Sequence, residues 1–182
     1  MSFAKAGLPM SSRLARVAWK FVYYALIRFT PRPFHAWRSL VLRLCGAKLG
    51  ARCHVYPRAA IWAPWNLVCA DDAGIADGVE IYNVACITIG RRAVISQGAY
   101  LCSASHDYSD ASRDEFPLTC APIEIGDCAW VAARSIVLPG VRIGEGCVIG
   151  AGSVVTGDMP PHSLCAGNPC RVIRSIRHES TD

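Results

Sequence analysis

A six-residue repeat dominates residues 123–156. Branched apolar residues stand at every sixth position of this stretch, at Ile125, Val131, Val137, Ile143, Ile149 and Val155. An amphipathic helix would space its apolar residues three and four apart, and a half-buried strand would space them two apart. A strict period of six is typical of a chain that makes one short strand and one corner in each unit. Three such units close one turn of a triangular parallel β-helix, in which each coil covers the core of its neighbour.

The residue types within the repeat agree with this interpretation. Val and Ile suit a buried pleated surface, and intervening glycines such as Gly140 and Gly146 permit tight corners. The alternative is a parallel sheet with crossover helices, which needs about a dozen residues or more between strands. The repeat leaves no room for such helices, so the sequence predicts an all-β solenoid.

The same six-residue step recurs earlier in the chain, from Leu49 to Leu67. A slip of two residues precedes Ile75 and Ile81, and a second slip of two precedes Ile89, after which the step continues to Leu101. Residues 102–122 interrupt it with a polar, acidic stretch, a long excursion of the kind that tends to carry function. The predicted organisation is therefore a helical segment at 1–46, a β-helix at 47–157 with a protruding loop at 102–122, and a C-terminal tail at 158–182. RVIRSIR, within that tail, is predicted as a last strand or a short helix.

The N-terminal segment contains two amphipathic stretches. Residues 11–29 predict a helix with Leu14, Phe21 and Phe29 on one face and Arg13 and Lys20 on another. This helix is too short and too charged to cross a bilayer. Two interpretations stay open: the helices cap the end of the solenoid, or they lie at a membrane interface where aromatic rings and cations meet anionic lipid. The cap is favoured because solenoids generally need one.

Composition sets further bounds. The chain has 182 residues, a formal net charge of +5 and a pI of about 8.7. This mild basic bias suits phosphate-bearing small molecules or an anionic membrane, and it is too weak to indicate nucleic acid. The ten cysteines contain no C-x-x-C pair, and His162, Cys165 and Cys170 lack a second cluster, so no metal is expected. Free thiols and the lack of a secretory signal predict the cytoplasm, with peripheral contact at the inner membrane face under the interfacial interpretation.

One histidine stands out among five. His106 lies where the repeat opens into the polar loop. A neutral imidazole at this place could act as a general base near pH 7, a role worth about 10²–10⁴-fold in rate. A loop histidine without a catalytic role is the competing interpretation, and the residues alone leave both open.

Several motifs in order resemble those of a known family. The hexads, the stretch from ITIG to YLCSASHDY, and IGEGCVIGAGSVVTGDMPP followed by AGNPCRVIR resemble the hexapeptide-repeat acetyltransferases. These are trimeric left-handed β-helix enzymes that move an acetyl group from acetyl-CoA to a hydroxyl. PRPFHAWRSLVLRLCGAKLG and SHDYSD are most similar to the colanic acid biosynthesis acetyltransferases, and less so to the galactoside, maltose and Nod-factor acetyltransferases. Left-handed coiling is an implication of this resemblance, because general chirality rules favour right-handed crossovers.

The resemblance implies an acceptor side of the site. His106 matches the family's catalytic histidine, which takes the proton of the acceptor hydroxyl as its oxygen attacks the thioester, without an acyl-enzyme. Asn83 matches an asparagine that binds the acceptor, and Trp130 matches an aromatic residue of the active-site wall.

The resemblance also implies a side that binds acetyl-CoA. The backbone N–H of Ala133 matches a donor to the tetrahedral oxyanion and to CoA. Ala151 and Thr156 match positions along the pantetheine groove, and Arg171 and Arg174 match cations that meet the CoA phosphates. Two departures weaken this side: many relatives have a lysine where Gly157 stands, with Arg177 as a candidate substitute, and many have a serine in place of Ala133.

The expected function is acetyl-CoA-dependent O-acetylation of a sugar hydroxyl in exopolysaccharide biosynthesis. The resemblance implies a homotrimer with sites between subunits and a saccharide acceptor, and the residue spacing and net charge predict no metal and no nucleic acid. A non-sugar acceptor, such as serine or a xenobiotic alcohol, and a non-catalytic β-helix scaffold are the alternatives. Zinc carbonic anhydrases with this fold need several histidines on the coil, whereas only His54 and His106 lie near coil positions here.

Overall fold

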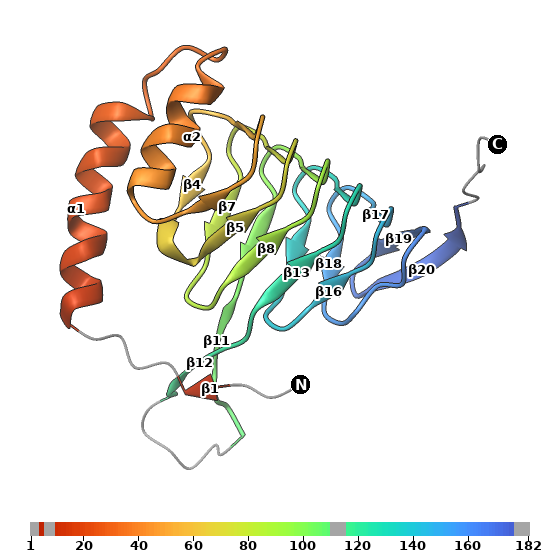
Figure 1. Ribbon diagram of the computed structural model, residues 1–182. Helices are drawn as coiled ribbons and strands as arrows, with labels where there is room; N and C mark the ends of the chain where they lie inside the picture. Colours follow the sequence, from red (N-terminus) through yellow and green to blue (C-terminus); the bar gives the residue numbers. More distant parts are fainter. Residues whose placement is uncertain (1–3, 6–9, 110–115, 177–182) are drawn as a thin grey trace.

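Short strands wind into a triangular solenoid of about six turns. The computed structural model describes residues 4–5, 10–109 and 116–176 of the chain. Figure 1 shows the coils stacked side by side, two helices over the first coils, a hairpin projecting from the side and a second hairpin at the far end.

Three parallel sheets form the faces of the solenoid. Face 1 contains β2 (Lys48–Leu49), β5 (Leu67–Cys69), β8 (Ile87–Ile89), β13 (Ile123–Ile125) and β16 (Arg142–Ile143). Face 2 contains β3 (His54–Val55), β6 (Gly74–Ile75), β9 (Val94–Ile95), β14 (Trp130–Val131), β17 (Val148–Ile149) and β19 (Ser163–Gly167), with β20 (Cys170–Ser175) added antiparallel. Face 3 contains β4 (Ala60–Ile61), β7 (Glu80–Tyr82), β10 (Tyr100–Cys102), β15 (Ile136–Val137) and β18 (Val154–Val155).

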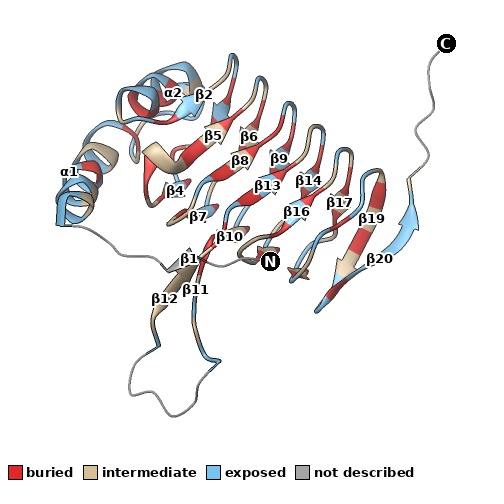
Figure 2. Ribbon diagram, turned by 60° about the horizontal axis from the view of Figure 1, so that its bottom comes forward, coloured by how far each residue is buried: buried red, intermediate tan, exposed pale blue. Residues whose placement is uncertain are grey.

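The predicted hexad residues form the core. Val131, Val137, Ile149 and Val155 have no exposed surface; the first three stack in register with the coils on both sides, and Val155 stacks on the coil before it. Figure 2 shows the buried positions recurring along successive strands of the solenoid. The prediction of an all-β solenoid is confirmed, and its cause is the one inward-facing branched residue per strand.

Corners between faces form the edges of the prism. The chain passes from face 1 to face 2, then to face 3, and then to face 1 of the next coil. Edge 2/3 denotes residues 56–59, 76–79, 96–99, 132–135 and 150–153. Edge 3/1 denotes residues 62–66, 83–86, 103–122, 138–141 and 156–158. The first corner of edge 3/1 includes a short 3₁₀ helix, η1 (Pro64–Asn66).

Two helices cover the first coil. α1 (Met10–Leu26) buries Trp19, whose indole Nε1 donates to the Ile61 carbonyl at 2.7 Å. α2 (His35–Leu44) buries Val41 and Leu42. The helices therefore act as a cap. The predicted helix at 11–29 ends earlier, at Leu26, where the chain turns toward α2. Leu14 and Phe21, predicted to share the apolar face, are 69% and 74% exposed on α1, and Phe29, which lies beyond the end of the helix, is 80% exposed.

A buried arginine joins the interhelical turn to the coil. Arg38 is completely buried, and its guanidinium donates to the carbonyls of Val55 (2.6 Å) and Pro31 (2.8 Å) and to the Thr30 hydroxyl (2.9 Å). It also donates to the Arg32 carbonyl. Because a buried charge is costly unless its hydrogen-bonding groups are satisfied, this set of acceptors fixes the turn.

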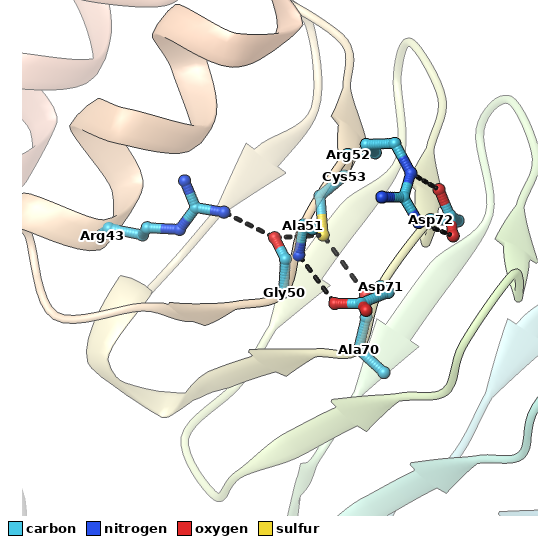
Figure 3. Close-up of polar contacts among 8 residues, drawn as sticks. All are labelled: Arg43, Gly50, Ala51, Arg52, Cys53, Ala70, Asp71 and Asp72. Atoms are coloured by element: carbon cyan, nitrogen blue, oxygen red, sulfur yellow. Dashed lines mark hydrogen bonds and ion pairs between the residues drawn. The ribbon is translucent and has the colours of Figure 1, made fainter.

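Polar contacts join α2 to the first two coils (Figure 3). Arg43 of α2 donates to the Gly50 carbonyl. The Ala51 N–H donates to Asp71 Oδ1 at 2.7 Å, and Arg52 forms a bidentate pair with Asp72 at 2.7 and 2.8 Å. The first coil is therefore held from both sides, by the helix before it and by the coil after it.

The predicted loop at 102–122 contains two strands. β11 (Ala104–His106) and β12 (Leu118–Cys120) form an antiparallel hairpin, and β1 (Ala4–Lys5) pairs with β12. Asp110, Asp114 and Glu115, which gave the loop its acidic character, lie outside the described residues. The hairpin projects from edge 3/1, and Figure 2 shows it below β10.

The C-terminal tail stays on the solenoid for one further strand. β19 continues face 2 in parallel with β17, and β20 folds back on β19. Residues 171–175 of RVIRSIR therefore lie in a strand, one of the two predicted forms. Arg177 lies outside the described residues. Across the described part of the chain, neither helix combines the length and hydropathy that crossing a bilayer requires.

Candidate active site

His106 is held in one tautomer by the backbone of its own hairpin. It is exposed at the end of β11, and its Nδ1 lies 2.7 Å from the Phe116 carbonyl oxygen. A carbonyl can only accept, so Nδ1 of the neutral ring carries the hydrogen and Nε2 presents a lone pair. The ring can therefore accept a proton at Nε2 while its other nitrogen stays bonded.

The hairpin fixes the position of this histidine. His106 is paired with Leu118 across the two strands, and the Asp107 N–H donates to the Pro117 carbonyl at 2.9 Å. At the base of the hairpin, the Ala121 N–H donates to the Ser103 carbonyl at 3.0 Å. The imidazole thus extends from a hydrogen-bonded ladder attached to a rigid coil.

The side chain of Asn83 is hydrogen-bonded within its own chain. It is completely buried on edge 3/1, where its Oδ1 accepts from the Ala63 N–H at 2.9 Å and its Nδ2 donates to the Ala63 carbonyl at 2.7 Å. Its backbone carbonyl accepts from Asn66 Nδ2 at 3.0 Å. This arrangement joins two successive corners of the solenoid at the root of the His106 hairpin.

Trp130 stands on the outer surface of face 2. Its side chain is 48% exposed, and the indole Nε1 donates to Ser96 Oγ on the preceding coil at 2.8 Å. Strand register places Trp130 in one row with Val148, Leu164 and Arg174. The row links the predicted aromatic wall with one of the predicted phosphate-binding cations.

Ala133 and Ala151 occupy neighbouring corners of edge 2/3. The Gly152 N–H donates to the Ala133 carbonyl at 2.9 Å, which connects the two corners. Among the described residues, the N–H groups of Ala133 and Ala151 have no acceptor. Asp77 and Gln97 show the same feature on earlier coils, so edge 2/3 presents a series of backbone donors. Such donors suit the carbonyls of an extended ligand.

The remaining predicted residues divide between two edges. Arg171 and Arg174 are exposed on β20, and Arg171 pairs with Ala166, which packs beside the Gly150 corner of edge 2/3. Thr156 is exposed directly after β18, on edge 3/1. One chain therefore gathers Ala133, Ala151 and Arg171 on one edge, and Asn83, His106 and Thr156 on the next.

The thiols near His162 are poorly suited to bind a metal. Cys147 Sγ lies 3.8 Å from Cys165 Sγ in the core, and burial raises the pKa of Cys147 to about 12. Burial also raises the pKa of Cys170, and a raised thiol pKa disfavours the thiolate that metals bind. Within the described ranges, no three His, Cys, Asp or Glu side chains gather as a metal site would.

Sequence reasoning missed the partners of two key side chains. The Phe116 carbonyl that orients His106 is a backbone group ten residues away, and residue type gives no signal for it. Ser96, the partner of Trp130, lies 34 residues earlier in sequence. Counting back along the repeat to the preceding coil places Val94 directly beside Trp130, with Ser96 two residues further along, so the repeat alone indicates only the neighbourhood of this partner.

Known proteins share these features over most of the chain. Residues 122–157 match the family described as "Bacterial transferase hexapeptide (six repeats)". The chain is 40% identical over 156 residues to "Putative colanic acid biosynthesis acetyltransferase WcaF" of Escherichia coli (strain K12), covering 86% of this chain and 84% of that protein.

Solved structures agree with the fold. A maltose O-acetyltransferase from Clostridium difficile 630 has a TM-score of 0.86 at 27% identity, over 97% of this chain and 94% of that one. The hexapeptide-repeat acetyltransferase VCA0836 from Vibrio cholerae O1 biovar eltor, complexed with acetyl coenzyme A, has a TM-score of 0.83 at 28% identity, over 94% and 92%. With its left-handed β-helix and its share of identity with these enzymes, the chain belongs to the hexapeptide-repeat acetyltransferases.

Proposed function

We propose that this acetyltransferase moves the acetyl group of acetyl-CoA to a saccharide hydroxyl during exopolysaccharide biosynthesis, with His106 as the general base. The observation that carries the proposal is the hydrogen bond between His106 Nδ1 and the Phe116 carbonyl at 2.7 Å. It leaves Nε2 ready to accept a proton, which is the form that a general base requires. The saccharide acceptor is supported by the names of the relatives, colanic acid biosynthesis acetyltransferase and maltose O-acetyltransferase.

The proposed reaction is a direct transfer. The acceptor hydroxyl donates its proton to His106 Nε2 while its oxygen attacks the thioester carbonyl, and the Ala133 N–H donates to the resulting oxyanion. The intermediate collapses to the acetyl ester, and the departing CoA sulfur receives the proton from His106. The Phe116 carbonyl stabilises the imidazolium between these steps. A general base contributes about 10²–10⁴-fold, and an oxyanion donor about 10²–10³-fold.

The division of the residues between two edges supports a site shared by subunits. His106 projects from edge 3/1, whereas the backbone donors of Ala133 and Ala151 line edge 2/3 of the same chain. We propose a homotrimer in which edge 3/1 of one subunit faces edge 2/3 of the next. His106 of one protomer then meets the acetyl-CoA held by its partner.

Each remaining predicted residue has a place in this arrangement. We propose that Ala151 contacts pantetheine on edge 2/3, that Arg171 and Arg174 of β20 bind CoA phosphates, and that Thr156 lines the facing edge. The exposed ring of Trp130 forms part of the wall, held by Ser96. Asn83 contributes by fixing the base of the His106 hairpin, because its side-chain amide is bonded to Ala63.

The outer faces of the helices support peripheral contact with an anionic membrane from the cytoplasmic side. Residues 1–70 contain eleven Lys and Arg and no Asp or Glu. Phe21, Phe29 and Leu44 are at least 74% exposed on this basic segment. Apolar side chains among cations fit an anionic lipid interface. Co-sedimentation with phosphatidylglycerol vesicles, but not with phosphatidylcholine vesicles, is the expected result.

A thiol-release assay tests the proposed function. Purified protein is incubated with acetyl-CoA and one acceptor at a time: nucleotide sugars, exopolysaccharide fragments, serine and a small xenobiotic alcohol. Mass spectrometry of the product identifies an acetyl ester, and sedimentation velocity gives the subunit number. The proposal predicts saccharide-dependent release by a trimer. Release with only serine or the xenobiotic alcohol would contradict the saccharide assignment, and a monomer with full activity would contradict the shared site.

A further inference from the structure

An arginine-lined pocket lies on the first coils of edge 2/3. Its volume is about 450 Å³, and its walls include Arg28 and Arg32 from the segment after α1, and Arg58 and Asp77 from two successive corners. This size is typical of small-molecule sites. None of these four residues belongs to the proposed catalytic set.

The cations of the pocket outnumber its carboxylate. Asp77 Oδ2 pairs with Arg32 Nη2 at 3.2 Å, and Asp77 Oδ1 accepts from the Arg58 backbone N–H at 3.1 Å. Within the part of the chain that the structure describes, the guanidinium groups of Arg28 and Arg58 pair with no carboxylate. The Arg28 guanidinium lies instead over the Phe29 ring at 5.6 Å. Two positive charges in the pocket therefore remain uncompensated.

The surrounding sequence does not supply the missing negative charge. Eleven of the nineteen Lys and Arg residues fall in residues 1–70, and all fourteen acidic residues come later. The completely buried Arg38 adds a further cation behind the pocket, since it donates to the carbonyls of Pro31 and Arg32. The summed field of such a cluster attracts anions.

We propose that this pocket binds a phosphate or pyrophosphate group. The planar guanidinium presents several N–H donors in a fork that matches phosphate oxygens, and such charge-assisted bonds are stronger than neutral ones. Arg28 and Arg58 supply the free donors. Asp77 holds Arg32 at the rim, with the carboxylate side chain 19% exposed.

The pocket lies on the same edge of the solenoid as the proposed acetyl-CoA site. The Gly78 N–H donates to the Arg58 carbonyl at 3.2 Å, and on later coils the Arg134 N–H donates to the Gln97 carbonyl at 3.0 Å. The pocket thus shares edge 2/3 with Ala133. Three coil spacings of about 4.8 Å separate the corners of Arg58 and Arg134, or about 14 Å.

A phosphate can reach this place on two kinds of molecule. One is a sugar phosphate that serves as the acetyl acceptor, and this role rests on the proposed function. The other is the headgroup of an anionic lipid, which agrees with the exposed Phe29 ring beside the pocket. The chemistry of recognition is the same in both cases.

Binding of pyrophosphate by isothermal titration calorimetry tests the site directly. The pocket variant is Arg28→Gln/Arg58→Gln. Lys48→Gln, which removes a cation from the first coil outside the pocket, is the matched control, and every titration contains saturating CoA so that the proposed CoA phosphate site at Arg171 and Arg174 is already occupied. The pocket variant is expected to weaken pyrophosphate binding about tenfold or more, and Lys48→Gln to change it less than about twofold. Thermal unfolding of each variant checks that it is folded. If the glutamine variant is unfolded, Arg28→Lys/Arg58→Lys replaces it as the pocket variant, because lysine lacks the guanidinium fork.

Two further arms identify the source of the phosphate. With uridine diphosphate glucose as acceptor, a rise in its KM in the pocket variant at unchanged KM for acetyl-CoA indicates an acceptor site. Loss of binding to phosphatidylglycerol vesicles, with acceptor kinetics unchanged, indicates a lipid headgroup site. Either result supports the proposal.

Two results would overturn the proposal: equal pyrophosphate affinity in the pocket variant and the wild type, or a wild type that does not bind pyrophosphate. His106→Ala separates this failure from that of the proposed function. It should keep wild-type pyrophosphate affinity, so acetyl transfer without pyrophosphate binding rejects the pocket alone. Pyrophosphate binding without acetyl transfer to any acceptor rejects the proposed function alone.

Discussion

His106 Nδ1 and the Phe116 carbonyl oxygen lie 2.7 Å apart, joining the two arms of the hairpin that projects from edge 3/1. The acceptor is a backbone group, so the orientation of the imidazole does not depend on the side chain at position 116. That side chain is 56% exposed. Substitution of Phe116 therefore tests how the imidazole is oriented, and substitution of His106 tests its role as the base.

Replacement of Asn83 by alanine should lower stability. The change leaves the buried N–H of Ala63 without a partner, whereas the Ala63 carbonyl still accepts from the Asn66 N–H, and an unsatisfied buried group costs about 1–3 kcal/mol. Urea unfolding should show a loss of about 1–3 kcal/mol, with Gln97→Ala, an exposed position on edge 2/3, near wild type. An unchanged free energy of unfolding with a raised acceptor KM would instead assign Asn83 to direct acceptor binding.

The pH dependence of stability should report on His35. Burial lowers the pKa of His35; the Val55 carbonyl opposes this, and Arg38 and His54 add to it. Because the folded-state pKa lies below the ordinary value of 6.5, the unfolded chain takes up the proton first as the pH falls. This contribution to stability is complete above the ordinary pKa and is lost as the pH falls through the folded-state pKa.

Melting temperatures across that range provide the measurement. The wild type should lose stability as the pH falls from above 6.5, and His35→Gln should lose less. Arg38 and Tyr56 also face this ring, so both variants are compared at the same ionic strength. An identical slope in the two proteins would show that His35 does not contribute.

Thiol reactivity should divide the cysteines by their place on the coil. Cys86 and Cys128 are exposed at corners, whereas Cys147 and Cys165 lie in the core, and burial raises the pKa of Cys147 to about 12. The thiolate is the reactive form, so iodoacetamide should label the exposed pair in the native protein and the core pair only after unfolding. Peptide mass spectrometry measures the order, and native labelling of Cys147 would contradict the packing described here.

Periodicity predicted the solenoid because its cause is local. Each strand needs one inward branched residue, and Val131, Val137 and Ile149 satisfy this need without exposed surface. The direction of the N-terminal helix was harder to predict. Apolar and aromatic residues occupy most of the helix surface, so more than one side could pack on the coil. The side with Trp19 packs on the end of the solenoid, and Leu14 and Phe21 remain exposed. Which face a helix buries depends on the shape of its partner, and periodicity does not contain that shape.

The candidate site was predictable only in part for the same reason. Resemblance gave the identities of His106, Ala133 and the arginines of β20, but not their distribution between two edges. That distribution follows from where each falls relative to the corners of the coil. The hydrogen bonds of the Asn83 side chain, likewise, are made to Ala63, twenty residues away.

The most direct test of the account compares His106→Ala with Phe116→Ala in a single-turnover acetyl-transfer assay. His106→Ala removes the base and should slow transfer by about 10²–10⁴-fold while CoA affinity stays unchanged. Phe116→Ala keeps the backbone carbonyl that orients His106, so its rate should stay within a few-fold of the wild type. Wild-type transfer by His106→Ala would contradict the assignment of the general base, and an equal loss in both variants would contradict orientation by the backbone alone.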